Sequence, residues 1–432
     1  MICSNLDINS EGVLTFAGRN TLELAKKYKT PLYLMDEERI RQNARVYVSS
    51  MKKYFGEDSL PLFASKAASF KQIYRIVNEE GMGVDVVSAG EFYTALAAGF
   101  PAEKVFFHGN NKTDDEIEYA IENKMGYFVA DSIEEICAID KFAAKKGVIQ
   151  KILLRITPGI DPHTYAEVAT GKVDSKFGFA IETGLADEAV RTALSKKNIS
   201  LVGLHCHVGS QVFDSEVYFK TADVMLMFIK DIKENYGFET KILNLGGGYG
   251  VRYTEDDPEI DICANIAQVA DRVKGRCNQL EIKVPMICME PGRSIVADSG
   301  LTLYTVGSVK RIPSYKNYVS VDGGMGDNPR FALYGSKYTV ALANKMNETP
   351  GLLCTVAGRC CESGDVIQEN VLLPDSVQKD DIVAVFTTGA YNYSMASNYN
   401  RVPRPPIVML AKDKEYVAVK RETWEDITAN DL

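Results

Sequence analysis

The chain has 432 residues and a formal net charge of −9, a length that predicts a large domain accompanied by a second one. The acidic balance without a basic block excludes a nucleic-acid backbone as a partner, and no apolar run approaches the roughly 20 residues that span a membrane. The nine cysteines have no regular spacing and are read as reduced thiols. Because the N-terminal sequence lacks the pattern of a secretory signal or a transit peptide, we expect a cytoplasmic protein without a membrane partner.

Eight β-rich runs alternate with helical stretches through the first two thirds of the chain. Such alternation is typical of a parallel sheet wound with helices, and eight units fit a closed (β/α)8 barrel of the TIM type better than an open sheet. Most runs end on a polar or reactive residue, as barrel enzymes keep their chemistry at this end of the strands. The runs cover residues 60–66, 83–88, 104–109, 127–131, 151–157, 201–207, 241–248 and 285–291.

After about residue 296, β-type runs follow one another with one helical interruption expected at residues 335–349. This texture indicates a second, mostly antiparallel β domain. Residues 1–30 offer no barrel strand, so we expect them to join that β domain. The expected division is therefore an N-terminal segment at 1–30, an α/β barrel at 31–295 and a C-terminal β domain at 296–432.

Lys66 ends the first of the eight runs. An apolar strand end disfavours the ammonium form and lowers the pKa of a lysine, and a neutral amine can form a Schiff base. A lysine at such a position is also commonly a charge that extends to water. Companion residues elsewhere in the chain decide between these interpretations.

Three glycines, Gly246 to Gly248, follow the seventh run. Consecutive glycines let backbone N–H groups converge on an anion, and the loop after the seventh strand of a barrel is a frequent phosphate site. The alternative is a tight turn between strand and helix. The dinucleotide-binding fingerprint is a poor match here.

His205 and His207 lie two residues apart and share one strand face, which invites a zinc interpretation, but no third ligand with suitable spacing is evident. We therefore expect no metal site. A flat imidazole at the strand end can instead stack on a planar cofactor ring, which we favour for His207, with Ser210 donating to the cofactor phosphate. His205, deeper in the strand, is expected to be structural.

Glu290 ends the last run, and Arg293 follows three residues later. A carboxylate beside a pyridine nitrogen keeps that nitrogen protonated, and a guanidinium suits a carboxylate or a phosphate. The alternative for this pair is a local salt bridge at a turn.

Four motifs together resemble the fold-type III decarboxylases that depend on pyridoxal 5'-phosphate (PLP). This family implies a PLP-binding barrel, a C-terminal β domain and a head-to-tail homodimer with shared active sites. Alanine racemase shares the fold but normally offers arginine to the pyridine nitrogen, so Glu290 argues against a racemase. The motifs are ASKA at 64–67, HVGSQ at 207–211, GGG at 246–248 and EPGRS at 290–294.

Further motifs resemble the diaminopimelate decarboxylase branch of the family, whose members convert meso-2,6-diaminopimelate into L-lysine and CO2 in the last step of lysine biosynthesis. The resemblance implies an amino acid as the small-molecule substrate. A decarboxylase for another basic amino acid, of the ornithine, arginine or carboxynorspermidine type, and a non-catalytic PLP-binding homologue stay open as alternatives. The motifs lie at residues 155–164, 170–178, 323–335, 361–365 and 389–391, and the small departures from the branch are Ala68 and Phe331.

The resemblance also implies the roles of individual residues. Lys66 would carry PLP, and Cys361, reaching in from the partner subunit, would return a proton to the substrate carbon or position the acid that does so. A buried, purely structural thiol is the commoner fate of a cysteine. The implied catalytic residues are Lys66, His207, Glu290 and Cys361; the other cofactor-binding residues are Asp85, Ser210, Gly246, Gly247, Gly248, Pro291, Gly292, Arg293 and Tyr391; the substrate-binding residues are Arg293, Arg330, Tyr334, Glu362 and Tyr391.

Overall fold

The computed structural model describes residues 1–160 and 174–432, so the motif expected at 155–178 lies partly outside the described residues. Two compact units divide the chain, and we call them the β unit and the barrel unit. The β unit comprises Met1–Gln42, Val251–Glu259 and Arg293–Leu432, and the barrel unit comprises Asn43–Gly250 and Ile260–Gly292.

The barrel unit contains eight parallel strands that pair in chain order and close when the last strand pairs with the first. The two-residue strand β10 (Phe179–Ala180) adds to the edge of one of them. The (β/α)8 barrel predicted from the sequence is thereby confirmed. The eight strands are β5 (Leu60–Ala64), β6 (Gly83–Val86), β7 (Val105–Phe107), β8 (Tyr127–Ala130), β9 (Gln150–Thr157), β11 (Ile199–His205), β12 (Ile242–Asn244) and β13 (Met286–Met289).

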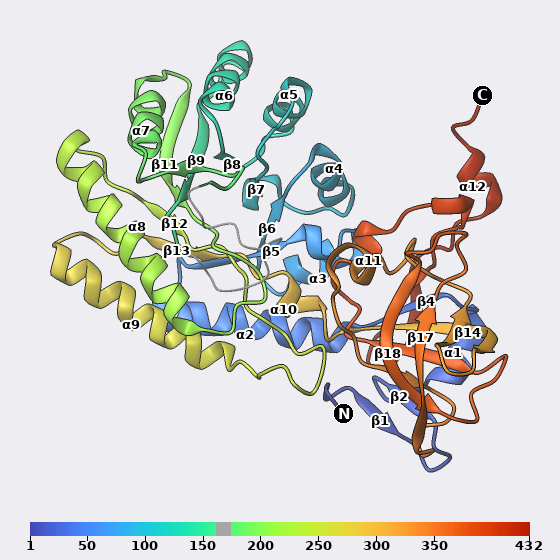
Figure 1. Cartoon of the computed structure of the whole chain (residues 1–432). Helices are drawn as coiled ribbons and strands as arrows, with labels where there is room; N and C mark the ends of the chain where they lie inside the picture. The colour runs from blue at the N-terminus through green and yellow to red at the C-terminus, as the bar shows by residue number, and fades with distance from the viewer. Residues whose placement is uncertain (161–173) are drawn as a thin grey trace. The chain divides into compact units, whose positions relative to one another are not determined.

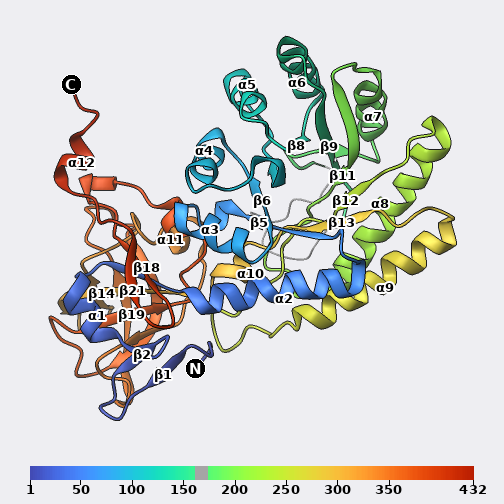
Figure 2. The ribbon, with the colours of Figure 1, turned by 180° about the vertical axis from the view of Figure 1, so that it is seen from behind.

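Helices cover the outside of these strands, and α8 and α9 run side by side (Figures 1 and 2). Local sequence sets their ends. Thr113 forms a capping box with Glu116 at the start of α5, and Gly147 and Gly237 end α6 and α8 in the left-handed conformation that glycine tolerates. The helices are α2 (Glu37–Phe55), α3 (Lys71–Glu79), α4 (Ala89–Ala97), α5 (Asp114–Glu122), α6 (Ile133–Lys146), α7 (Leu185–Ser195), α8 (Ser215–Tyr236) and α9 (Ile262–Leu280).

One cluster of buried side chains draws one residue from each of seven barrel strands. Phe106 and Leu153 are fully buried in this cluster. Close packing of this kind makes a barrel a filled core rather than a pore, which leaves the strand ends as the place for polar chemistry. The members are Leu62, Phe106, Val129, Leu153, Val202, Ile242 and Cys288.

The β unit is built on a second sheet in which two pairings, β15 with β17 and β4 with β20, are parallel and the others antiparallel. The mostly antiparallel β domain predicted from the sequence is confirmed. Its strands are β4 (Leu32–Asp36), β14 (Gly300–Arg311), β15 (Asn317–Val321), β16 (Val340–Leu342), β17 (Pro350–Ala357), β18 (Val366–Pro374), β19 (Ile382–Phe386), β20 (Ile407–Leu410) and β21 (Glu415–Val419).

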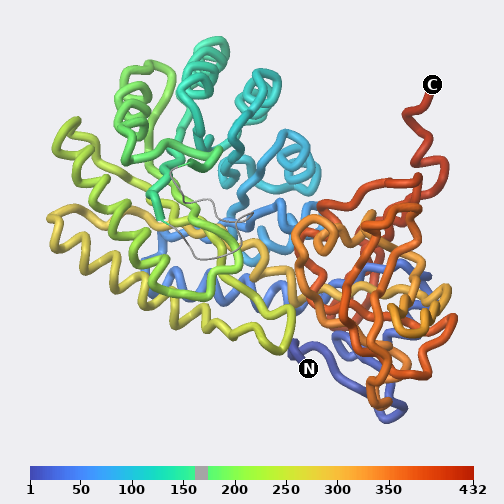
Figure 3. The backbone as a smooth tube through the Cα atoms, in the orientation of Figure 1, coloured from blue at the N-terminus to red at the C-terminus, as the bar shows by residue number. Residues whose placement is uncertain are grey.

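The N-terminal segment packs into this unit, and Figure 3 shows its trace running among the C-terminal segments. Phe16 and Leu24 share an apolar core with Leu301 and Leu303. The unit extends past residue 30, where the sequence placed the junction, because β4 fills the gap between β14 and β20. The segment contributes β1 (Leu6–Ile8), β2 (Leu14–Phe16), β3 (Arg19–Asn20) and α1 (Thr21–Tyr28).

The helical interruption expected at 335–349 is wrong. The helix in this region is α11 (Arg330–Tyr334), and it ends at Gly335 with a φ of +61°. Residues beyond it form β16, because β19 supplies antiparallel hydrogen-bonding partners that outweigh the local helical pattern. The remaining helices are α10 (Arg293–Val296) and α12 (Trp424–Thr428).

Across the two described stretches of the chain, no helix has both the length and the apolar character that crossing a bilayer requires.

Candidate active site

Lys66 lies in one turn of 3₁₀ helix, Ser65–Ala67, immediately after β5. Ser65 is buried and its hydroxyl donates to the Glu91 carboxylate at 2.5 Å, which holds the turn in place. The Lys66 side chain is exposed, so its amine is accessible to a ligand. The local structure therefore fixes the backbone of Lys66 and leaves its amine reachable.

The loop Gly246 to Gly248 follows β12 and has no room for side chains. A Cβ atom on Gly247 would lie 2.0 Å from the carbonyl oxygen of Glu290, and one on Gly248 would lie 2.2 Å from that of Gly209. Gly246 and Gly248 also have φ values of +70° and +109°, which disfavour other residues. A backbone-only loop of this kind fits a phosphate group, which is the first indication that the barrel unit suits PLP.

His207 lies two residues beyond the end of β11, and its surroundings favour the neutral ring. Burial, together with the charges of Lys66 and Arg155, lowers the pKa of His207 well below its ordinary value. The Gly247 N–H donates to Nδ1 of His207 at 3.3 Å, which orients the ring next to the glycine loop. A neutral, oriented imidazole suits stacking on a pyridine ring.

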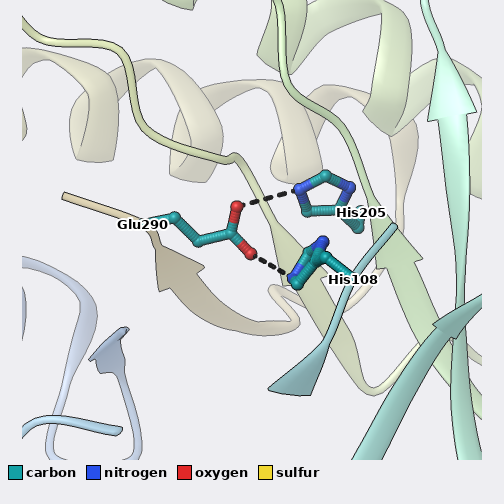
Figure 4. Close-up of side chains that lie close together, drawn as sticks. All are labelled: His108, His205 and Glu290. Atoms are coloured by element: carbon teal, nitrogen blue, oxygen red, sulfur yellow. Dashed lines mark hydrogen bonds and ion pairs between the residues drawn. The ribbon is translucent and has the colours of Figure 1, made fainter. Parts of the chain in front are cut away.

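Glu290 is buried directly after β13, and its carboxylate has three close partners, of which Figure 4 shows the two histidines. The Nε2 atoms of His108 and His205 lie 2.8 Å and 3.1 Å from its two oxygens, and Nδ2 of Asn244 donates to Oε1 at 2.6 Å. Burial alone would raise the pKa of Glu290, but the two histidines hold it well below its usual range. A carboxylate has about four acceptor positions, so these neighbours leave a position for a pyridinium N–H.

The side chains of His108, His205 and Glu290 also place their ligand-type atoms within 4.8 Å of one another, a spacing that a metal ion could use. Each histidine nitrogen, however, faces a carboxylate oxygen at hydrogen-bonding distance. From the sequence, His205 is expected to be structural, and His108 has no predicted role. Their shared contact with Glu290 depends on the closure of the barrel, and no sequence spacing indicates it.

Asp85, Pro291 and Gly292 complete the predicted cofactor set in the barrel unit. Asp85 is buried on β6, and burial raises its pKa to about 6 while the charge of His108 opposes the rise. A Cβ atom on Gly292 would lie 2.9 Å from Cβ of Ala64, so the chain beyond Glu290 packs closely on the end of β5.

A second cluster lies within the β unit and joins four of the residues predicted there. The guanidinium groups of Arg293 and Arg330 lie 4.7 Å and 5.4 Å from the centroid of the Tyr391 ring. Both arginines are buried. Arg330 also lies 5.6 Å from the ring centroid of Tyr334, which is 41% exposed. Two cations around one aromatic ring form a site suited to anionic groups.

Sequence reasoning missed two tyrosines of this cluster. Nη1 of Arg293 donates to the Tyr253 hydroxyl at 2.7 Å, and the Tyr253 and Tyr338 rings meet edge to face at 5.2 Å. Burial raises the pKa of Tyr338 to about 12, although the charge of Arg330 opposes the rise, so the phenol stays neutral. Tyr253 belongs to the short segment Val251–Glu259, which is part of the β unit although the residues on both sides of it belong to the barrel unit. No sequence signal indicated that this segment belongs to the β unit.

Cys361 and Glu362 also lie in the β unit, and both are exposed. The Cys361 N–H donates to Oδ1 of Asn400 at 2.7 Å, and the Glu362 carboxylate accepts from the Gly364 N–H at 3.1 Å. Cys361 is thus not the buried structural thiol that the sequence left open as an alternative. None of the contacts described for these two residues reaches Arg293 or Arg330.

Comparison with known proteins gives a consistent assignment. Residues 39–297 match the family of the pyridoxal-dependent decarboxylases, pyridoxal binding domain. The chain is 44% identical to the diaminopimelate decarboxylase of Bacillus subtilis (strain 168), over 98% of this chain and 96% of the relative. It is 43% identical to that of Staphylococcus aureus (strain COL), over 98% of both.

Solved structures give the same assignment. The diaminopimelate decarboxylase of M. jannaschii in co-complex with L-lysine matches with a TM-score of 0.91 and 33% identity, covering 100% of this chain and 98% of that one. The Helicobacter pylori enzyme complexed with L-lysine matches with a TM-score of 0.85 and 32% identity, covering 95% and 98%. The chain therefore belongs to the diaminopimelate decarboxylases, a family of PLP-dependent decarboxylating enzymes.

Proposed function

We propose that the chain converts meso-2,6-diaminopimelate into L-lysine and CO2, the last step of lysine biosynthesis. The observation that carries the proposal is the pair of buried guanidinium groups around Tyr391 in the β unit. The substrate has a second carboxylate that lysine and ornithine lack, and paired cations are what its recognition requires. The solved relatives of M. jannaschii and Helicobacter pylori that hold L-lysine support the same reaction.

The barrel unit would hold PLP through residues that each serve one part of the cofactor. The Lys66 amine would bind it covalently, the loop Gly246 to Gly248 would take its phosphate, and Glu290 would accept from the ring nitrogen. His207 would stack on the ring, while Ser210 and Asp85 would complete the polar surroundings. PLP, when bound, supplies an electron sink for the electron pair that departing CO2 leaves behind.

Residues of the β unit would recognise the substrate. Arg330 and Arg293 would bind the distal carboxylate through charge-assisted hydrogen bonds, and Tyr334 would add a hydroxyl. Glu362 would accept from the distal ammonium, and Tyr391 would contact cofactor and substrate. This division explains why the sites for chemistry and for selection lie in different parts of the sequence.

Cys361 would handle the proton that replaces the lost carboxylate. Its exposed thiol can act on a site of a second subunit, so we propose a homodimer in which each subunit lends Cys361 and Glu362 to its partner. All nine cysteines are free, and this supports the reducing cytoplasm as the place of the reaction.

The proposal is tested by CO2 release from meso-diaminopimelate, lysine, ornithine and arginine. A site built for two carboxylates leaves a desolvated cation unpaired when the second is missing, so kcat/KM should favour meso-diaminopimelate by roughly a thousandfold or more. Comparable turnover of ornithine would move the chain to another branch of the family. Borohydride reduction of the loaded protein should label Lys66 and spare Lys112, a buried lysine whose Nζ lies 2.8 Å from Glu135.

A further inference from the structure

The Glu290 carboxylate is held by groups from three other strands of the barrel. His108 directly follows β7, His205 ends β11 and Asn244 ends β12. Their side chains are all buried, so no water competes for the carboxylate among these groups. Oδ1 of Asn244 also accepts from the Gly246 N–H at 3.0 Å, which ties the orientation of the carboxylate to the glycine loop.

The geometry assigns a protonation state to His205. Its Nε2 can donate to Glu290 only if it carries the proton, and its Nδ1 is buried without a hydrogen-bond partner among residues 1–160 and 174–432. A doubly protonated ring would leave an N–H unpaired in the core, which is energetically unfavourable. The arrangement therefore fits a neutral ring with the proton on Nε2. His108 presents the same nitrogen to the other carboxylate oxygen.

We propose that His108 and His205 are positioning residues that hold Glu290 as an oriented carboxylate and thereby keep the ring nitrogen of bound PLP protonated. The inference rests on the role proposed above for Glu290. A single buried carboxylate would otherwise take up a proton to escape desolvation. If one donor is lost, the shared proton moves from the ring nitrogen to the carboxylate oxygen, and the ring becomes a weaker electron sink.

Other charges near this group do not replace the two histidines. Asp85 is an acid, so its negative charge repels that of Glu290. Lys66 and Arg155 are cations, and their charges lower the pKa of the neighbouring His207. Of the described neighbours, His205 and Asn244 have hydrogen bonds to the carboxylate, and Nε2 of His108 lies 2.8 Å from Oε1.

The test replaces each histidine in two ways. Glutamine keeps an amide donor near the position of Nε2, whereas leucine keeps the volume and removes the donor. Each variant is loaded with PLP labelled with ¹⁵N in its ring, and the ¹⁵N chemical shift is recorded without substrate at one neutral pH. Glu290→Gln serves as the reference for loss of the carboxylate.

The matched control is Gln150→Leu, which removes a buried amide of the same barrel that donates to Met125 and Gly126 rather than to Glu290. We expect a pyridinium signal in the unchanged protein, in both glutamine variants and in the control. In both leucine variants, at least half of the ¹⁵N signal of the ring should lie at the chemical shift of a neutral pyridine. Retention of the full pyridinium signal by the leucine variants, or its loss in the glutamine variants as well, would overturn the proposal.

A second measurement needs no destabilising variant. The chain has four histidines, so ¹⁵N labelling of histidine in the unchanged PLP-loaded protein gives few signals, which the glutamine variants assign. His108 and His205 should both carry the proton on Nε2, and an Nδ1-protonated ring at either position contradicts the proposal. Because neither measurement uses substrate, failure of the protein to act on diaminopimelate would leave these results intact.

Discussion

Among single residues, Arg330 is the one whose replacement should change substrate choice most. Its buried guanidinium is expected to bind a carboxylate that only diaminopimelate carries. Arg330→Ala should therefore lower kcat/KM for diaminopimelate by roughly a hundredfold or more and leave the weak turnover of lysine nearly unchanged. Steady-state CO2 release with both substrates measures this.

The control for Arg330 is Arg311→Ala, since Arg311 is an exposed arginine of the same unit that donates to the Asp375 carbonyl at 2.7 Å. It should leave both rates as they are. An equal loss for the two substrates in Arg330→Ala would assign Arg330 a structural role.

His205 should make stability depend on pH in a defined window. Burial lowers its pKa to about 4, although Glu290 opposes the shift, while the unfolded side chain titrates near 6.5. Between these values the unfolded chain binds a proton that the folded chain does not. The contribution of His205 to the free energy of unfolding is therefore fully present above about pH 6.5 and is lost as the pH falls toward 4. Asp85, with a pKa raised to about 6, acts in the opposite direction between about pH 4 and 6.

Chemical unfolding of the apoprotein at pH 5.5 and at pH 7.5 isolates the histidine. His205→Gln cannot titrate, so its unfolding free energy should lose less than that of the unchanged protein on acidification, by on the order of 1 kcal/mol. The contributions of Asp85, His108, Arg155 and Glu290 are present in both proteins and largely cancel in the difference. Identical pH dependence of the two proteins would show that His205 titrates normally.

The positions of individual candidate residues were predictable where a motif marks them. Lys66, the glycine triplet and Glu290 each lie at a strand end, where the pattern of apolar runs places them. The contacts of Glu290 with His108 and His205, and of Arg293 with Tyr253, were not predictable, because residues between 40 and 182 positions apart meet only through the closure of the sheet.

At the scale of elements, the loop after β12 depends on glycine more strictly than a helix does. A Cβ atom on Gly247 would lie 2.0 Å from the Glu290 carbonyl oxygen, so Gly247→Ala must displace the loop or the strand end beside it. We expect the variant to bind PLP at least tenfold more weakly, as measured by titration of the apoprotein. Gly275 in α9 is exposed and would meet no atom within 4 Å, so Gly275→Ala should bind PLP normally and stabilise the fold by roughly 0.5–1 kcal/mol.

The eight barrel strands were predictable from sequence because short apolar runs that are bounded by polar residues and alternate with helical stretches are typical of buried parallel strands. The segment after α11 was not. Its residues carry a helical pattern, and the strand Val340–Leu342 exists only because β19 lies beside it. Local preference decides an element when no partner strand competes with it, and here one does.

For the whole molecule, the proposed homodimer predicts that inactive subunits can complement each other. A Lys66→Ala subunit lacks the covalent anchor, and a Cys361→Ala subunit lacks the exposed thiol. In a mixed dimer, one of the two sites would combine the intact Lys66 of one subunit with the intact Cys361 of the other. Mixing the two variants in equal amounts, with subunit exchange verified by mass, should restore up to roughly a quarter of the activity. No recovery after proven exchange would show that the sites are not shared.

The position of β4 between β14 and β20 has a consequence for how the protein is made. β4 leaves the ribosome early, yet its first neighbour follows roughly 260 residues later, and translation at about 5–20 residues per second makes it wait tens of seconds. The barrel unit is complete before either neighbour exists, because its last residue is Gly292. All five residues of β4 (Leu32–Asp36) are buried in the folded protein. During that interval the segment has no neighbouring strand to pair with, so its exposed backbone and apolar side chains can bind a chaperone. Synthesis of the N-terminus and its incorporation into the fold are therefore separate events, and the second must await the end of the chain.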